Sequence, residues 1–259
     1  MEPGGAARSL AYLRAEGDPK MPDQPGTARH VSRHSAIVER LGSDITSGKL
    51  ATGLVLRSED MEQKYEVTRS VLREGLRVLE TLGMVSSRRS VGVSIRPQAE
   101  WNVFDPLVVR WRLNGAGRAA QLRSLTELRS AVEPLAAKLA ATRIAAEDGR
   151  RLLELAAGLE VTAAAGDLAA FLPLDIQFHA LILKASGNEM LLNLESAIAE
   201  VLTGRTQHGL MPDRPEPEPL RLHLEVARAV VASEPAAAHA AMQRIVDIAG
   251  QEMDAILGG

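Results

Sequence analysis

Apolar positions in the first third of the chain recur at helical spacing and predict three short helices. The first helix lies in residues 35–47 and ends at Gly48; its apolar face comprises Ile37, Val38, Leu41 and Ile45. The second is expected over residues 58–65, because Ser58 is a good N-cap and two acidic residues follow it. The third has Thr68 as its N-cap and ends at Gly83.

A basic hairpin is predicted directly after the third helix. Two short β-like runs, residues 84–87 and 93–97, flank the segment RRSVG, which carries Arg88 and Arg89. On the third helix, three arginines repeat every four residues and share one face: Arg69, Arg73 and Arg77. Such a row is either a solvated surface or a surface that binds a polyanion.

Three helices followed by a basic hairpin are typical of a winged helix-turn-helix. In that motif the N-terminal residues of the recognition helix reach base edges and phosphates in the major groove. The residues at that position here are Thr68, Arg69, Ser70 and Arg73. We therefore expect the arginines to face DNA and the leucines of the same helix to pack inside the domain.

The second half of the chain is rich in alanine and leucine and predicts six or so amphipathic helices joined by short loops. The expected fold is mainly α, with an N-terminal winged helix-turn-helix and a C-terminal antiparallel helical bundle. The expected divisions are a disordered arm (1–34), the DNA-binding domain (35–97), a linker (98–117) and an all-helical domain (118–256). In the linker, three aromatic side chains are available to pack the two domains together: Trp101, Phe104 and Trp111.

Composition narrows the class of protein. The chain has no cysteine, which excludes disulfides and thiolate metal sites. No run of about 18 apolar residues or secretory signal is evident, so we expect a cytoplasmic protein without a membrane span. Residues 35–97 carry ten basic and eight acidic side chains, whereas residues 98–259 carry 15 and 21. A mildly basic module joined to an acidic one suits a DNA-binding protein.

One pair of residues in the second half suggests metal chemistry. Asp175 and His179 are four residues apart in a predicted helix, so they lie on the same face. Such a pair can grip a divalent cation. A hydrogen-bonded pair without a metal is the more common use of this spacing, and both alternatives stay open on spacing alone.

Residues 48–95 resemble the DNA-binding domain of GntR-family bacterial transcription regulators, and the all-helical second half resembles the effector domain, called FCD, of the FadR subgroup. The matching positions include Gly48, Leu50, Gly53, Ser58, Glu59, Val67, Thr68, Arg69, Leu72, Arg73, Glu74, Leu82, Gly83 and Gly92. The connector AEWNVFDPLVVRWRL is similar to that of regulators of sugar-acid catabolism. The resemblance implies that DNA contacts extend to the wing tip at Arg89 and Ser90.

The resemblance also implies a site in the second domain. In the FadR subgroup, an Asp-x-x-x-His pair and two further histidines line a cavity and often bind a metal, such as zinc, that helps to hold a carboxylate effector. Asp175 and His179 match the pair, and His223 matches the third histidine. Ile245 occupies the fourth position and cannot ligate a metal. Arg129 lies where relatives place an arginine that faces the cavity, although a simple ion pair with Glu133 is an equal alternative.

These inferences together predict a homodimeric repressor of a catabolic operon, released from its DNA operator by a small carboxylate such as a sugar acid. One alternative is a metal-dependent helical-bundle enzyme that acts on a small carboxylate. We do not favour it, because no nucleophile or general base accompanies the three candidate ligands. A further alternative is a helical interaction protein whose basic domain binds DNA without sequence preference.

Overall fold

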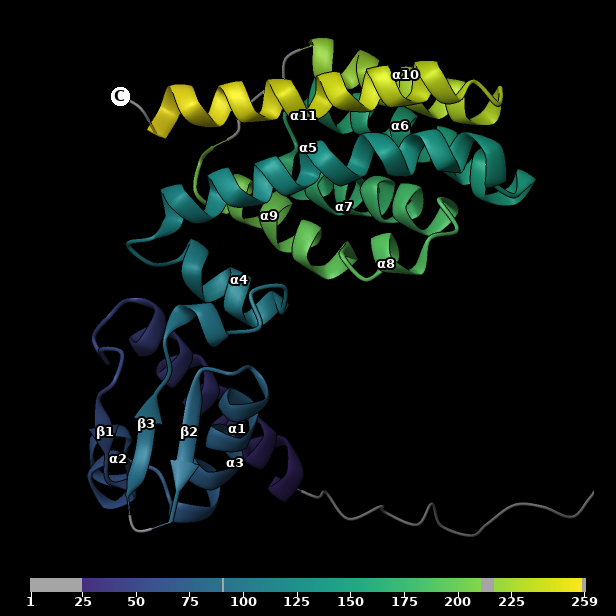
Figure 1. Cartoon of the computed structure of the whole chain (residues 1–259). Helices are drawn as coiled ribbons and strands as arrows, with labels where there is room; N and C mark the ends of the chain where they lie inside the picture. The colour runs from purple at the N-terminus through teal and green to yellow at the C-terminus, as the bar shows by residue number, and fades with distance from the viewer. Residues whose placement is uncertain (1–24, 90, 211–216, 258–259) are drawn as a thin grey trace, which may run out of the picture.

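The computed structural model describes residues 25–89, 91–210 and 217–257. The N-terminal body, which we call the head, contains three helices and a small sheet (Figure 1). Its elements are α1 (Pro25–Thr46), β1 (Val55–Leu56), α2 (Ser58–Tyr65), α3 (Arg69–Thr81), β2 (Val85–Arg88) and β3 (Gly92–Ile95). The recognition helix α3 ends before Gly83, whose φ of +71° suits glycine.

The first helix is longer than its apolar face predicts. α1 begins at Pro25, so residues 25–34, which we expected to lack regular structure, are helical; residues 1–24 lie outside the described residues. Proline is favoured at the first helical position, and no second proline follows before Thr46. The early start therefore agrees with local sequence, although the apolar periodicity begins only near Ile37.

The sheet contains one strand that the sequence pattern did not indicate. β2 and β3 form the expected antiparallel hairpin, with Val85 opposite Ile95, and the two-residue strand β1 pairs with the other edge of β3. A strand of two residues has no periodicity to detect. The buried side chains Val93 and Ile95 of β3 complete a core formed mainly by α1 and α3.

The C-terminal body is an all-helical bundle, which we call the bundle. Its helices are α5 (Arg118–Arg143), α6 (Ala146–Ala165), α7 (Leu168–Ala185), α8 (Glu189–Leu192), α9 (Glu195–Gln207), α10 (Pro217–Val231) and α11 (Pro235–Leu257). α11 lies along α5 and α10, while α7 packs between α5, α6 and α9. Asp167 caps α7 as expected, because its side chain accepts a hydrogen bond from the Ala170 amide.

A short helix within the predicted linker connects the two bodies. α4 (Pro106–Leu113) begins with Asp105 as its N-cap and contacts α1 on the head and α9 on the bundle (Figure 1). Trp111 belongs to the core of the head, whereas Val109 and Leu113 belong to a cluster with bundle residues. Phe104, expected to pack between the domains, is instead 52% exposed. It precedes α4 and belongs to neither hydrophobic cluster that α4 joins.

Among the described residues, α7 is the one helix that is long and apolar enough to cross a membrane by length and composition. α7 is not a continuous apolar run, because it carries Asp175, His179 and Lys184. It is covered by α5, α6 and α9, and it contributes Phe178 and Ile182 to the core of the bundle. Its apolar character is that of a central core helix.

Candidate functional site

The first candidate site is a basic groove on the head, between the recognition helix and the wing. The groove is lined by five arginines, two of which come from the wing: Arg69, Arg73, Arg77, Arg88 and Arg89. Glu74 pairs with Arg77 at 3.0 Å on the exposed surface, and the predicted contacts Thr68 and Ser70 are also exposed. Ser90, the remaining predicted contact, lies outside the described residues.

The turn between α2 and α3 sets the angle at which the recognition helix is presented. Glu66 caps α2 in the left-handed conformation, with φ of 54°. Thr68 is the N-cap residue of α3, and its hydroxyl lies 3.1 Å from that of Ser70 rather than on a backbone amide. Both hydroxyls are exposed at the N-terminal end of α3, where a phosphate or base edge can accept their hydrogen bonds.

The second candidate site is a cavity of about 40 Å³ inside the bundle. It is lined from α5, α7, α9, α10 and α11 by both apolar and charged side chains. The charged and titratable members are Arg129, Asp175, His179, Arg205, His223 and Glu252. Ile245 is also part of the lining, so the position without a histidine presents an apolar surface to the cavity.

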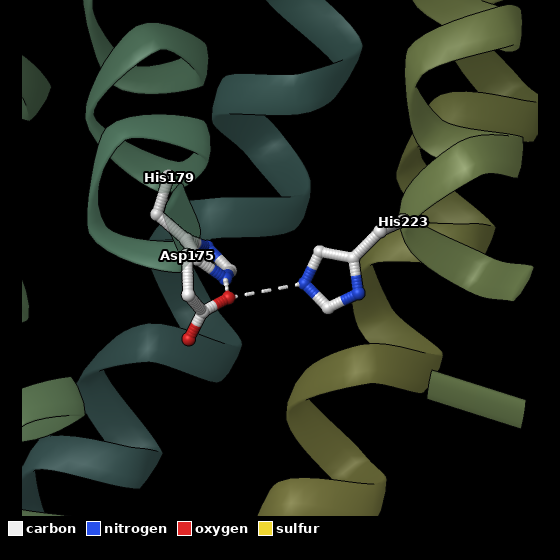
Figure 2. Close-up of side chains that lie close together, drawn as sticks. All are labelled: Asp175, His179 and His223. Atoms are coloured by element: carbon white, nitrogen blue, oxygen red, sulfur yellow. Dashed lines mark ion pairs between the residues drawn. The ribbon is translucent and has the colours of Figure 1, made fainter. Parts of the chain in front are cut away.

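Three of the predicted residues converge in this cavity (Figure 2). Asp175 Oδ1 lies 3.5 Å from Nε2 of His179 and 3.3 Å from Nε2 of His223, and ligand atoms from all three residues lie within 4.8 Å of one another. His179 shares α7 with Asp175, while His223 faces them from α10 (Figure 2). We call Asp175, His179 and His223 the triad.

In both histidines of the triad Nε2 faces Asp175, and the outer nitrogen, Nδ1, lies close to an oxygen acceptor. His223 Nδ1 lies 2.6 Å from the Pro219 carbonyl oxygen, which can only accept, so Nδ1 carries the proton. In a neutral imidazole, Nε2 is then a bare acceptor, and here it faces the Asp175 carboxylate without a hydrogen bond. Two facing acceptors repel unless a proton or a cation lies between them. Metal-binding histidines have this arrangement, with the outer nitrogen on a carbonyl or carboxylate.

His179 has a carboxylate as its outer neighbour. Its Nδ1 lies 3.0 Å from Glu133 Oε2, although the ring N–H is not aligned for a regular hydrogen bond. Burial alone would lower the pKa of His179, but Glu133 and Asp175 raise it to about 9. Burial would likewise raise the pKa of Asp175, yet the two histidines hold it well below its usual range. The triad therefore favours an ionised carboxylate held close to positive charge.

For Arg129 the sequence left two alternatives open, an ion pair with Glu133 and a position at the cavity, and the structure shows both. Its Nε and Nη2 donate to the two oxygens of Glu133, at 2.8 and 3.2 Å, so the predicted ion pair exists. The guanidinium also lines the cavity, and its Nη1 is buried without a hydrogen-bond partner. Arg129 can therefore keep its pair with Glu133 and still donate one hydrogen bond to a ligand.

The sequence reasoning missed Arg205 and Glu252. Arg205 on α9 is 6% exposed and pairs through Nη2 with Glu252 of α11 at 3.0 Å; its Nε is buried without a partner. Burial and the nearby Arg129 lower the pKa of Arg205 to about 10. The one available signal was an arginine on a helix face that is otherwise apolar. His208 and His239 are both half-buried, and neither lines the cavity.

Comparison with known proteins identifies two domain families in the chain. Residues 33–95 match the family model for bacterial regulatory proteins of the gntR family, and residues 124–247 match the FCD domain. The galactonate operon transcriptional repressor of Escherichia coli is 28% identical over 196 residues, covering 74% of this chain and 84% of that one. The uncharacterized regulator YieP of the same organism is 26% identical over 215 residues, covering 81% and 90%.

A solved structure of Lar, titled for control of the Listeria monocytogenes agr system, has the same fold. It has a TM-score of 0.52 at 14% identity and covers 85% of this chain and 95% of that one. The two domain matches together span the head and most of the bundle. The chain is therefore a DNA-binding transcription regulator of the GntR family with an FCD domain, of the FadR subgroup, and not an enzyme.

Proposed function

We propose that the protein represses a catabolic operon in the cytoplasm and leaves its operator when a small carboxylate, such as a sugar acid, enters the cavity of the bundle. The observation that carries this proposal is the cavity itself, where buried guanidinium nitrogens without partners lie near the triad. Such donors bind carboxylates well. The name of the Escherichia coli relative, a repressor of a galactonate operon, adds support.

We infer that the triad holds a divalent cation such as zinc. The donor set fits, since one carboxylate oxygen and two Nε2 atoms converge and both outer nitrogens face acceptors. Three protein ligands leave a coordination position for effector or water oxygens, and Ile245 supplies no fourth side-chain ligand. A bound cation would supply a Lewis-acid anchor for the effector's oxygens. The chain's own residues orient that acid, mainly through Arg129.

A thermal-shift panel of aldonates, uronates and dicarboxylates tests both parts of this proposal. The protein is measured with chelator and then with added zinc, beside the variant Asp175→Asn. We expect one sugar acid to stabilise the parent protein with zinc and to lose most of its effect with chelator or in Asp175→Asn. If the acid stabilises the protein equally with and without chelator, no metal is needed, and the triad binds the acid by direct hydrogen bonds. If no acid has any effect, the carboxylate effector is wrong.

Arg129→Ala separates effector binding from DNA binding. We expect it to weaken release of DNA by the effector while leaving operator affinity unchanged, because Arg129 lies in the bundle. The readout is fluorescence anisotropy of a labelled operator duplex, selected from random sequence by the full chain. Equal loss of DNA binding and effector response would contradict the assignment.

We propose that Arg69, Arg73 and Arg89 contact DNA, with Thr68, Ser70 and Ser90 beside them. Arg73→Ala should weaken binding about tenfold and reduce the slope of log affinity against log salt by about one, as loss of one phosphate contact does. Arg150→Ala is the matched control, because Arg150 is an exposed arginine of the bundle. If operator affinity and its salt dependence are unchanged in Arg73→Ala, Arg73 does not contact DNA.

We further propose that two protomers read a short palindrome. A symmetric dimer presents two recognition helices to two half-sites, so the two-fold symmetry of the protein matches that of a palindrome. Sedimentation of the protein with a duplex that carries one or both half-sites tests this proposal. A single protomer on the complete operator would overturn it.

A further inference from the structure

We propose that Glu252 competes with the effector for Arg205. Glu252 pairs with Arg205 in the ligand-free protein, and the carboxylate of the incoming acid replaces it. This inference rests on the proposed function for the identity of the acid. The carboxylate site on Arg205 stands independently of it. The site combines Arg205 of α9 with Glu252 of α11, and both residues line the cavity.

The geometry shows an anion site that is only partly satisfied. Arg205 is 6% exposed, and one of its nitrogens pairs with Glu252 while Nε has no partner. Arg129 lines the same cavity and holds a second unpartnered nitrogen, the buried Nη1. Buried charge-assisted donors without acceptors are costly. A carboxylate with two oxygens, entering between the guanidinium groups, would satisfy donors that Glu252 leaves unpaired.

The size of the cavity requires a side chain to move. About 40 Å³ holds roughly three water molecules, which is far less than a six-carbon acid needs. Two carboxylates line the cavity, those of Asp175 and Glu252. The side chain of Asp175 is 7% exposed, whereas that of Glu252 is 23% exposed. Glu252 is therefore the carboxylate that can turn towards water more easily. Its movement would enlarge the cavity and free the guanidinium group of Arg205.

The exchange keeps the charge of the cavity constant. A buried guanidinium left without a counter-ion is destabilising, so a ligand-free site with Arg205 alone would lower the stability of the fold. Glu252 supplies that counter-ion until one carboxylate replaces another. The exchange also explains selection for an acid, because a neutral sugar would displace Glu252 and leave Arg205 without a negative partner.

Chemical rescue with acetate tests the carboxylate site without knowledge of the effector. In Glu252→Ala the internal carboxylate is gone, and acetate can take its place on Arg205. At about ten times its dissociation constant, acetate should raise the melting temperature by about 3–6 °C more than chloride at equal ionic strength. The parent protein and the double variant Arg205→Gln/Glu252→Ala should respond to the two salts equally.

Glu154→Ala is the matched control, because Glu154 pairs with Arg151 on the open surface of α6. That variant should show no acetate rescue, since an exposed pair loses little when one partner is removed. If acetate and chloride act equally on Glu252→Ala, the carboxylate site on Arg205 is wrong. If acetate still stabilises the double variant more than chloride does, acetate binds at a site other than Arg205.

The isosteric variant Glu252→Gln tests the competition and is the fallback if Glu252→Ala does not fold. It keeps the volume of the side chain but removes its charge, so the sugar acid that stabilises the parent should bind about tenfold tighter. Weaker binding would overturn the competitor role. If acetate rescue succeeds while no sugar acid binds any variant, the proposed effector class fails and the carboxylate site stands.

Discussion

At the scale of single residues, Glu133 organises the site although it does not line the cavity. It accepts two hydrogen bonds from Arg129 and lies 3.0 Å from His179 Nδ1, with 1% of its side chain exposed. Burial alone would raise the pKa of Glu133, but Arg129 and His179 lower it from 4.5 to about 2. Glu133 thus holds an effector donor and a candidate metal ligand in fixed orientations.

Glu133→Gln should destabilise the metal-free protein by about 3–5 kcal/mol near neutral pH, because it leaves a buried guanidinium without its counter-ion. A carboxyl group with a lowered pKa contributes stability that is fully present above its unfolded pKa of 4.5 and is lost as the pH falls towards 2. The difference in free energy of unfolding between parent and variant should therefore narrow below pH 4.5. Urea unfolding at pH 6 and pH 3.5 measures it; a pH-independent difference would contradict the role of the charge.

Part of the site could be predicted from sequence, and the reason lies in helical spacing. Asp175 and His179 share a face because they are four residues apart, and the structure brings them together with His223. Arg205 and Glu252 are 47 residues apart, and their pairing depends on how the bundle brings α9 and α11 within reach of each other. Periodicity shows which face of a helix is buried but does not specify which helix covers it. Family resemblance supplied His223 and Arg129, which both line the cavity, but neither Arg205 nor Glu252.

At the scale of elements, a glycine explains how α1 meets α4. Gly42 lies inside α1, where it is less favourable than alanine by about 1 kcal/mol. A Cβ atom at this position would lie 2.5 Å from the ring of Trp111. The indole N–H donates to Glu39, one turn earlier on the same helix, at 2.6 Å. From the sequence alone, Gly42 only lowers the helix propensity of α1. The packing shows that the absence of a side chain at Gly42 lets the ring of Trp111 lie against the helix.

Gly42→Ala should lower the stability of the protein by about 1–2 kcal/mol, because the overpacking cost exceeds the gain in helix propensity. The contact involves the rigid indole rather than the end of a flexible chain. Gly117→Ala is the control, since no heavy atom lies within 4 Å of a Cβ atom there. Thermal unfolding of both variants measures the effect. Equal stability of the two variants would show that Trp111 adapts freely.

At the scale of the whole molecule, Arg110 connects the head with the bundle. Its Nη2 lies 2.8 Å from Glu39 of α1, and its Nη1 lies 3.4 Å from Glu200 of α9. Glu200 is five residues before Arg205 on the same helix. A displacement of α9 on effector binding would therefore change the contact of α4 with the head. Coupling of this kind needs an element that both sites contact, and α4 with α9 provides one.

Arg110→Ala should reduce the effector's influence on operator affinity by several-fold while each binding event persists. The pairs are partly exposed, so their loss should cost little stability. Arg150→Ala again serves as the control. Operator affinity with and without the active sugar acid gives the coupling directly. If the ratio of the two affinities stays at the parent value, the route through Arg110 is wrong.

The apolar character of α7 has a consequence for biosynthesis. This helix leaves the ribosome before α9, α10 and α11, and its length and composition are those of a membrane-crossing segment. An aspartate near the middle of such a segment costs about 3 kcal/mol on insertion into a bilayer. Asp175 lies eight residues into α7. The same carboxylate that faces the two histidines in the finished fold would therefore disfavour insertion of α7 into a bilayer.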